Sequence, residues 1–150
     1  MEKLNDIIFY RLDKAIKTYR QFAQLELKAA GIHITIDQWI VLKTISEKAG
    51  ISQRAIAENV FKDEASVTRI IELLVKKGLL ARNFHSDDRR KIVLVPNRET
   101  RSLLEKVRKI ALKNRARALE GIPARDLELA RRVLDRISVN CSKRTGMGKV

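Results

Sequence analysis

The residues best suited to chemistry lie between Asp63 and Arg69, where small and hydroxyl side chains precede an arginine. A small side chain such as Ala65 lets a backbone come close to nucleic-acid bases. The hydroxyls of Ser66 and Thr68 can bond to bases or phosphates, and Arg69 can fork onto O6 and N7 of a guanine. If these residues share the exposed face of a helix, that face suits the major groove of DNA.

A shorter candidate helix precedes this segment, and its first residues are expected to join the same DNA-binding surface. They are Ser52, Gln53 and Arg54. The two helices, 52–60 and 63–77, are separated by the brief turn 61–62, which is the spacing of a helix-turn-helix. An ordinary pair of amphipathic helices has the same spacing, so the spacing alone leaves both interpretations open.

A charged loop over residues 85–90 follows, between two short apolar segments that read as strands at 79–84 and 91–95. The tip of this hairpin is basic, with Arg89, Arg90 and Lys91. Arginine at such a tip can enter the minor groove, where A·T-rich sequences concentrate negative potential. Taken alone, the tip favours an ordinary solvated turn, but its place directly after the helix pair favours the wing of a winged helix.

Helical periodicity and capping residues predict the remaining elements. A long amphipathic helix is expected over 3–30, and the capping box of Thr35 and Gln38 should begin a second helix that ends near Gly50. Ser52 and Asp63 should cap the two helices of the pair. Asn97 should cap a helix to about Glu120, and a last helix should follow Pro123. The predicted fold is therefore mainly α, a winged helix-turn-helix over 33–96 with helical dimerisation regions at 1–32 and 97–150.

Composition points to a polyanionic partner. The chain has 150 residues and a formal net charge of +14. Residues 97–150 alone hold 15 basic and 6 acidic side chains, so an architectural DNA-binding protein of low specificity is a rival interpretation. A single cysteine, Cys141, suits a reducing compartment. With no signal peptide and no apolar run of membrane-spanning length, a cytoplasmic protein without a membrane partner is expected.

Enzyme and metal signatures are absent from the sequence. No phosphate-binding glycine loop, zinc-protease motif or nucleophile elbow occurs, so no catalytic residue and no cofactor are predicted. His85 lies near Asp87 and Asp88, but zinc sites need three or four clustered ligands, and no metal site is predicted. A nuclease would need the two aspartates to hold a divalent metal, which plasmid cleavage with Mg²⁺ would test.

Taken together, these motifs resemble the MarR family of bacterial and archaeal regulators. The resemblance rests on the stretch Asp63–Arg69, which is similar to the family's hydroxyl-rich S-x-V-T-R recognition helix, on an L-x-x-K-G exit ending at Gly78, and on a D-R-R wing at Asp88–Arg90. It implies a homodimer held by the first, fifth and sixth helices. It also implies Ser66, Thr68 and Arg69 in the major groove and Arg90 in the minor groove of double-stranded DNA.

The resemblance further implies two supporting features. Asp88 should brace the wing through a neighbouring arginine. A small aromatic or anionic effector could bind near the side chains of Tyr19, Phe22, His33 and Trp39, although the residue types by themselves favour plain core over a pocket. Glu64 departs from the family's usual basic or neutral residue and leaves the base preference open. The expected function is sequence-specific binding to a pseudo-palindromic operator, repressing transcription until an effector releases the DNA.

Overall fold

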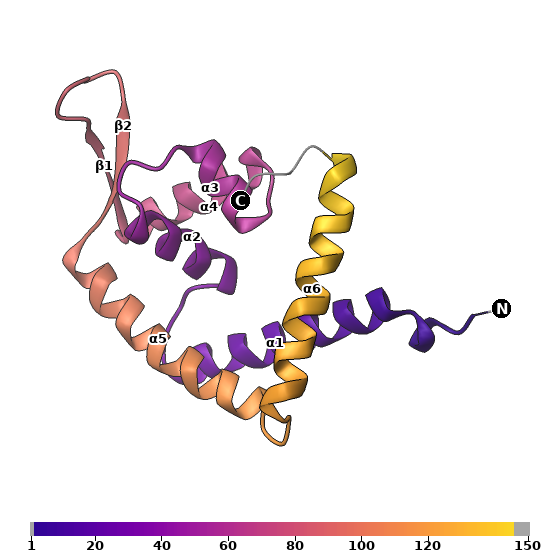
Figure 1. Cartoon of the computed structure of the whole chain (residues 1–150). Helices are drawn as coiled ribbons and strands as arrows, with labels where there is room; N and C mark the ends of the chain where they lie inside the picture. Colours follow the sequence, from indigo (N-terminus) through magenta and orange to yellow (C-terminus); the bar gives the residue numbers. More distant parts are fainter. Residues whose placement is uncertain (1, 146–150) are drawn as a thin grey trace. The chain divides into compact units, whose positions relative to one another are not determined.

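The computed structural model describes residues 2–145 and is mainly helical, with one two-stranded antiparallel sheet (Figure 1). Its elements, in chain order, are η1 (Leu4–Asp6), α1 (Ile8–Ala29), α2 (Ile36–Glu47), α3 (Gln53–Val60), α4 (Glu64–Lys76), β1 (Leu80–Phe84), β2 (Ile92–Pro96), α5 (Arg98–Ala118) and α6 (Ala124–Thr145). The chain forms two compact units, Met1–Asn114 and Arg115–Val150. The predicted mainly α fold, with a two-stranded hairpin after a helix pair, is confirmed, and dimerisation through the terminal helices stays a prediction.

Side-chain caps fix the starts of four helices, as the sequence predicts. Thr35 and Gln38 form a full capping box at the start of α2. The hydroxyl of Ser52 accepts from the Ala55 amide, and the carboxylate of Asp63 accepts from the Ser66 amide. The amide oxygen of Asn97 accepts from the Thr100 backbone at 2.7 Å. Each cap satisfies an amide that the first helical turn leaves unpaired.

The first helix is shorter than the predicted span of 3–30. Leu4–Asp6 form a separate 3-10 turn, and Ile7 is extended with ψ 115° before α1 begins at Ile8. Asn5 and Asp6 are poor residues for a helix interior, because their short polar side chains compete for nearby backbone groups. Residues 2–6 are also exposed, so no tertiary packing extends the helix toward the N-terminus.

The core of the first unit lies among α2, α3 and α4, with α1, β1 and α5 contributing at its margins. Its fully buried centre is apolar and comprises Val41, Leu42, Ile45, Ile56, Val67, Ile71 and Leu74. At about 25 cal/mol per Å² of apolar surface, burial of these side chains is the main term that holds α3 and α4 in their pairing. The helix pair is therefore a rigid base for the exposed residues that it carries.

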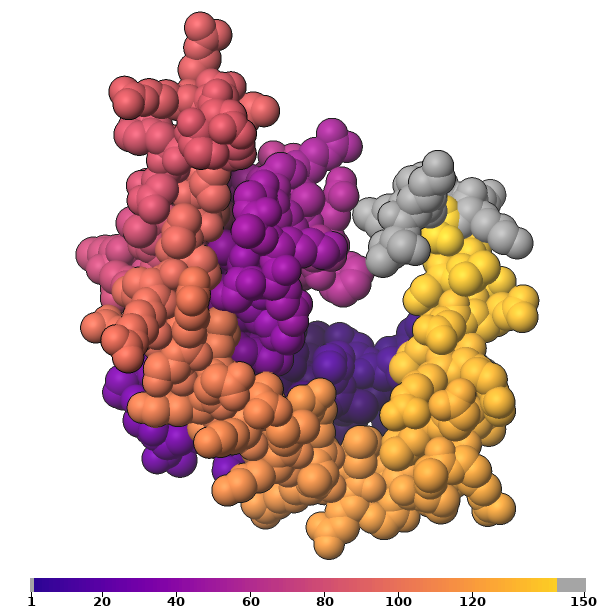
Figure 2. All heavy atoms as spheres, turned by 60° about the vertical axis from the view of Figure 1, so that its left-hand side comes forward, coloured from indigo at the N-terminus to yellow at the C-terminus, as the bar shows by residue number. Residues whose placement is uncertain are grey.

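The hairpin β1–β2 extends beyond the helices that carry it (Figure 2). Its register pairs Leu80 with Pro96 at the base and Phe84 with Ile92 near the tip. Only Leu80 is buried, which anchors the base to the core and leaves the tip in solvent. The strands begin one residue later than predicted, and β2 includes Pro96, which is tolerated at the end of a two-stranded sheet because both strands are edges.

Candidate nucleic-acid interface

The α3–α4 pair presents the predicted surface. Lys62 donates its amide to the Ala57 carbonyl at 3.0 Å, which closes α3, and α4 begins two residues later. Since α4 buries Val67 and Leu74, its opposite side faces solvent, where Ala65 and Arg69 are exposed. The predicted separation of an inward apolar face from an outward polar face is confirmed.

The hydroxyl groups on this surface already make hydrogen bonds within the protein. Ser66 donates its Oγ–H to Asp63 Oδ2 at 2.7 Å, and Thr68 donates to the Glu64 carbonyl at 2.8 Å. Gln53 donates its side-chain amide to the Thr68 hydroxyl and so ties α3 to α4. In this arrangement the two hydroxyls have lone pairs to offer a ligand, and each must rotate before it can donate a proton.

Asp63 is held in its charged form at the start of α4. The side-chain hydrogen bond from Ser66, together with the Ser66 backbone amide, holds the pKa of the Asp63 carboxyl below its ordinary value. A carboxylate at this position also interacts favourably with the positive end of the α4 helix dipole. Of the α4 residues predicted to contact DNA, Arg69 is the basic one, and its side chain is exposed.

At the start of α3 two of the three predicted residues make local contacts. The Ser52 hydroxyl accepts from the Ala55 amide, and Arg54 forms an exposed ion pair with Glu58 at 3.3 Å. Exposed pairs one helical turn apart contribute only about 0.3–0.5 kcal/mol, so Arg54 can leave Glu58 for a phosphate at little cost.

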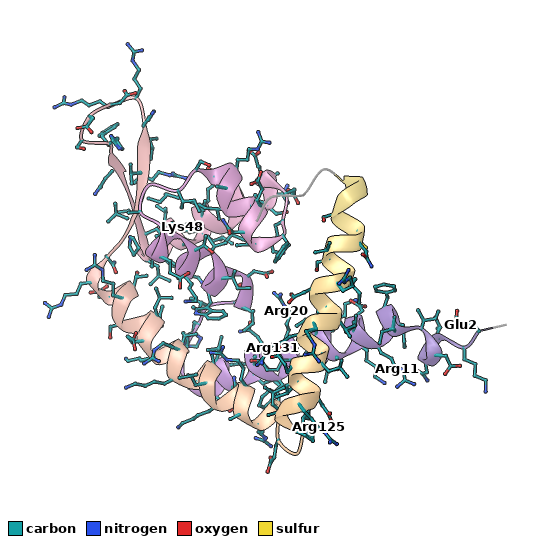
Figure 3. All side chains as sticks on the ribbon, viewed as in Figure 1. Glu2, Arg11, Arg20, Lys48, Arg125 and Arg131 are labelled. Carbon is teal, nitrogen blue, oxygen red and sulfur yellow. The ribbon has the colours of Figure 1, made fainter. Side chains whose placement is uncertain are left out.

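The tip of the hairpin is organised by Asp88. Its carboxylate accepts from the backbone amide of Arg90 at 3.0 Å, and its carbonyl accepts from the Lys91 amide at 3.0 Å. The neighbouring arginine that Asp88 supports is therefore Arg90, and the contact is to its main chain. The side chains of Arg89, Arg90 and Lys91 are exposed, and nitrogen-ended side chains project from this tip in Figure 3.

A shallow hollow of about 220 Å³ opens between α1 and the start of α2. Its lining comprises Arg20, Gln21, Gln24, Thr35, Ile36 and Asp37. None of the four predicted effector residues belongs to this lining. Trp39 packs against the core, and His33 is exposed. The rings of Tyr19 and Phe22 lie tilted by 52° to each other, with their centroids 6.5 Å apart.

An ion network beside this hollow is a feature that the sequence patterns do not reveal. The carboxylate of Asp37 pairs with Arg20 of α1, labelled in Figure 3, and with Lys62 of the α3–α4 turn at 3.2 Å. Partial burial raises the pKa of Asp37, but the hydrogen bonds and charges of Lys62 and Arg20 outweigh burial and hold the pKa below its ordinary value. The Asp37 carboxylate thus joins α1, the start of α2 and the α3–α4 turn.

Other kinds of site find no support in the described part of the chain. Among the residues that the structure describes, no group of three or more histidine, cysteine, aspartate or glutamate side chains could hold a metal ion. Over the same residues no helix is both long and apolar enough to cross a membrane. Cys141 is an exposed free thiol.

Comparison with known proteins agrees with this geometry. Residues 34–92, which hold α2, α3, α4, β1 and the hairpin loop, match the MarR family model. A putative transcriptional regulatory protein for the hcr operon of Thauera aromatica is 32% identical over 79 residues. The match covers 53% of this chain and 46% of that relative, so it spans less than half of the relative's length.

Solved structures share the fold over most of the chain. One is Bordetella bronchiseptica BpsR, whose structure is described as explaining how 6-hydroxynicotinic acid regulates its DNA binding. It has a TM-score of 0.81 at 20% identity, and the match covers 92% of this chain and 97% of that one. CouR from Rhodococcus jostii RHA1, bound to p-coumaroyl-CoA, has a TM-score of 0.77 at 24% identity, covering 91% and 95%. Residues 34–92 therefore match the MarR family model, and the solved structures share the fold over most of the chain.

Proposed function

We propose that this chain is a transcription regulator that binds a pseudo-palindromic DNA operator as a homodimer and represses transcription. The observation that carries the proposal is the α3–α4 pair, whose buried face is apolar and whose outward face exposes Ala65 and Arg69 beside a basic hairpin. A helix about 10–12 Å across fits the major groove, and a hairpin tip fits the minor groove next to it.

In the proposed complex each element has a distinct role. Arg69 reads a guanine, with Ser66 and Thr68 accepting from base amino groups or, after rotation, donating to phosphates. Gln53 and Ser52 position α3 at the DNA backbone, where Arg54 contacts a phosphate. Arg90 enters the minor groove from a tip that Asp88 keeps in shape.

The homodimer is proposed to form through the regions 1–32 and 97–150. Several large apolar side chains of α1 are at least half exposed, among them Ile8, Phe9 and Ile16. On α6 Leu129 and Val139 are similarly exposed. Apolar surface of this extent is usual for a dimer interface. Two copies related by a two-fold axis would present their α4 helices about one DNA turn apart, near 10 base pairs.

An anionic effector is proposed to bind at the hollow between α1 and α2. By their descriptions, the DNA binding of BpsR is regulated by 6-hydroxynicotinic acid, and CouR is bound to p-coumaroyl-CoA. Both small molecules carry acidic groups. A carboxylate in this hollow would compete with Asp37 for Arg20. Loss of that ion pair would loosen α1 from α2 and from the α3–α4 turn, and so weaken DNA binding.

In vitro selection of duplexes from a random pool tests the proposal. The expected result is one enriched motif, an imperfect inverted repeat whose halves lie about one helical turn apart. Selection by Arg69→Ala in parallel should relax one symmetric pair of positions. A pool that stays random after several rounds with the wild type would overturn sequence-specific binding and favour the architectural alternative.

A further inference from the structure

Phe61 has an unusual backbone conformation. It ends α3 with φ 55° and ψ 43°, in the left-handed region. Among the described residues it is the one position other than glycine with positive φ, and the four other such positions are all glycine. A bulky side chain in this region is disfavoured by clashes with its own backbone, so glycine or asparagine would suit the turn better.

The fold gains nothing visible from the Phe61 side chain. The side chain is 93% exposed, the highest value among the exposed large apolar residues. It therefore combines an unfavourable backbone conformation with an apolar ring in water. Strained residues of this kind are concentrated at functional sites, so the Phe61 ring is a candidate for contact with a partner.

The position of Phe61 indicates what kind of partner its side chain contacts. It lies two residues before Asp63, the cap of α4, and so beside the end of α4 that we place in the major groove. Its near neighbours in the chain include Glu58, Asp63 and Glu64. The one basic residue among them, Lys62, is paired with Asp37. Carboxylates repel phosphate, so the surroundings favour contact with a base edge.

We propose that Phe61 contacts the 5-methyl group of a thymine in the major groove and makes the operator specific for thymine at that position. The thymine methyl is the one apolar group that a base presents in this groove, and apolar side chains such as phenylalanine recognise it. The inference rests on the proposed function, because it requires α4 to enter the major groove.

The test pairs a protein variant with a DNA variant. Thymines of the selected operator are replaced one symmetric pair at a time by deoxyuridine, which lacks only the methyl group. At one pair the wild type should lose about fourfold in affinity per half-site, the effect of removing one buried methyl group. Phe61→Asn, whose side chain tolerates the left-handed backbone, should bind the thymine operator more weakly and show no uracil effect.

Two controls separate this contact from general effects. Phe84→Asn removes another exposed aromatic side chain, on the hairpin rather than beside α4, and should keep the uracil effect in full. Phe61→Asn should unfold at the same temperature as the wild type or a higher one, because the substitution relieves strain.

The outcomes distinguish the two levels of the proposal. A wild type that selects an operator but is indifferent to every uracil substitution overturns the thymine contact and leaves the proposed function intact. So does a uracil effect that persists unchanged in Phe61→Asn, or a lower unfolding temperature for that variant. A wild type that selects no operator overturns the proposed function and, with it, the contact.

Discussion

Replacing Asp37 by asparagine should lower the free energy of unfolding by about 1–2 kcal/mol at neutral pH, because it discharges the centre of the Arg20–Asp37–Lys62 network. Asparagine has nearly the same size as aspartate and keeps one oxygen that can accept a hydrogen bond. The substitution therefore tests charge rather than packing.

The magnitude follows from the exposure of the network. Hydrogen bonds to charged groups contribute about 1.5–3 kcal/mol when buried, whereas fully exposed ion pairs contribute about 0.2–1 kcal/mol. The side chains of Asp37, Arg20 and Lys62 are 33%, 40% and 32% exposed, so solvent screens each pair substantially. About 0.5–1 kcal/mol for each of the two pairs gives the expected loss.

The pH dependence has a definite sign. The pKa of Asp37 in the folded chain lies below its ordinary value, so its stabilising contribution is fully present above the unfolded-state pKa of about 3.9. The contribution is lost as the pH falls through the lower folded-state value. The difference between wild type and Asp37→Asn should therefore be constant from about pH 5 to pH 7 and shrink below about pH 4.

Urea unfolding at fixed chain concentration and several pH values provides the assay. Asp13→Asn is the matched control, because Asp13 pairs with Lys17 one helical turn away in a strongly exposed position, and it should cost no more than about 0.5 kcal/mol. The reasoning fails if the two variants lose equal stability at neutral pH. It also fails if the Asp37→Asn difference stays the same down to pH 3.

Three further predictions concern DNA binding and assembly. Arg69→Ala should cost about 1–3 kcal/mol on the selected operator and much less on scrambled DNA, and equal losses in binding isotherms would contradict base reading. Arg90→Ala should weaken binding most where the outer flanks are A·T-rich, with Asp88→Ala giving a smaller loss. Unchanged affinity of Arg90→Ala for those flanks would refute the minor-groove contact. Deleting residues 1–20 should yield a monomer in sedimentation and abolish tight DNA binding, whereas a wild type that is monomeric at micromolar concentration would exclude the dimer.

Local features of the fold could be predicted from the sequence, because each is decided within a few residues. The caps Thr35, Ser52, Asp63 and Asn97 all bond to amides three residues ahead. The inward face of α4 follows from helical periodicity. The start of α1 was not predictable in the same way, since the helical pattern of apolar residues runs through Leu4 while the short polar side chains after it favour a separate turn.

Long-range features could not be predicted from periodicity or motif spacing. Arg20, Asp37 and Lys62 are separated by 17 and 25 positions in the chain, and only tertiary packing brings them together. A turn between α3 and α4 is predicted, but the left-handed backbone of Phe61 depends on the hydrogen bonds that end α3. The hollow between α1 and α2 is lined by Ile36 and five polar or charged residues, whereas the aromatic residues proposed for a pocket lie outside its lining.

The central claim, that this chain reads a DNA sequence, is tested most directly by the ratio of its affinities for the selected operator and for a scrambled duplex of equal length and composition. Both are measured at one fixed salt concentration near physiological strength, because phosphate contacts make each affinity strongly salt-dependent. A sequence-specific regulator should bind the operator at least about a thousandfold more tightly. A ratio near one, with tight binding to both duplexes, would contradict the claim.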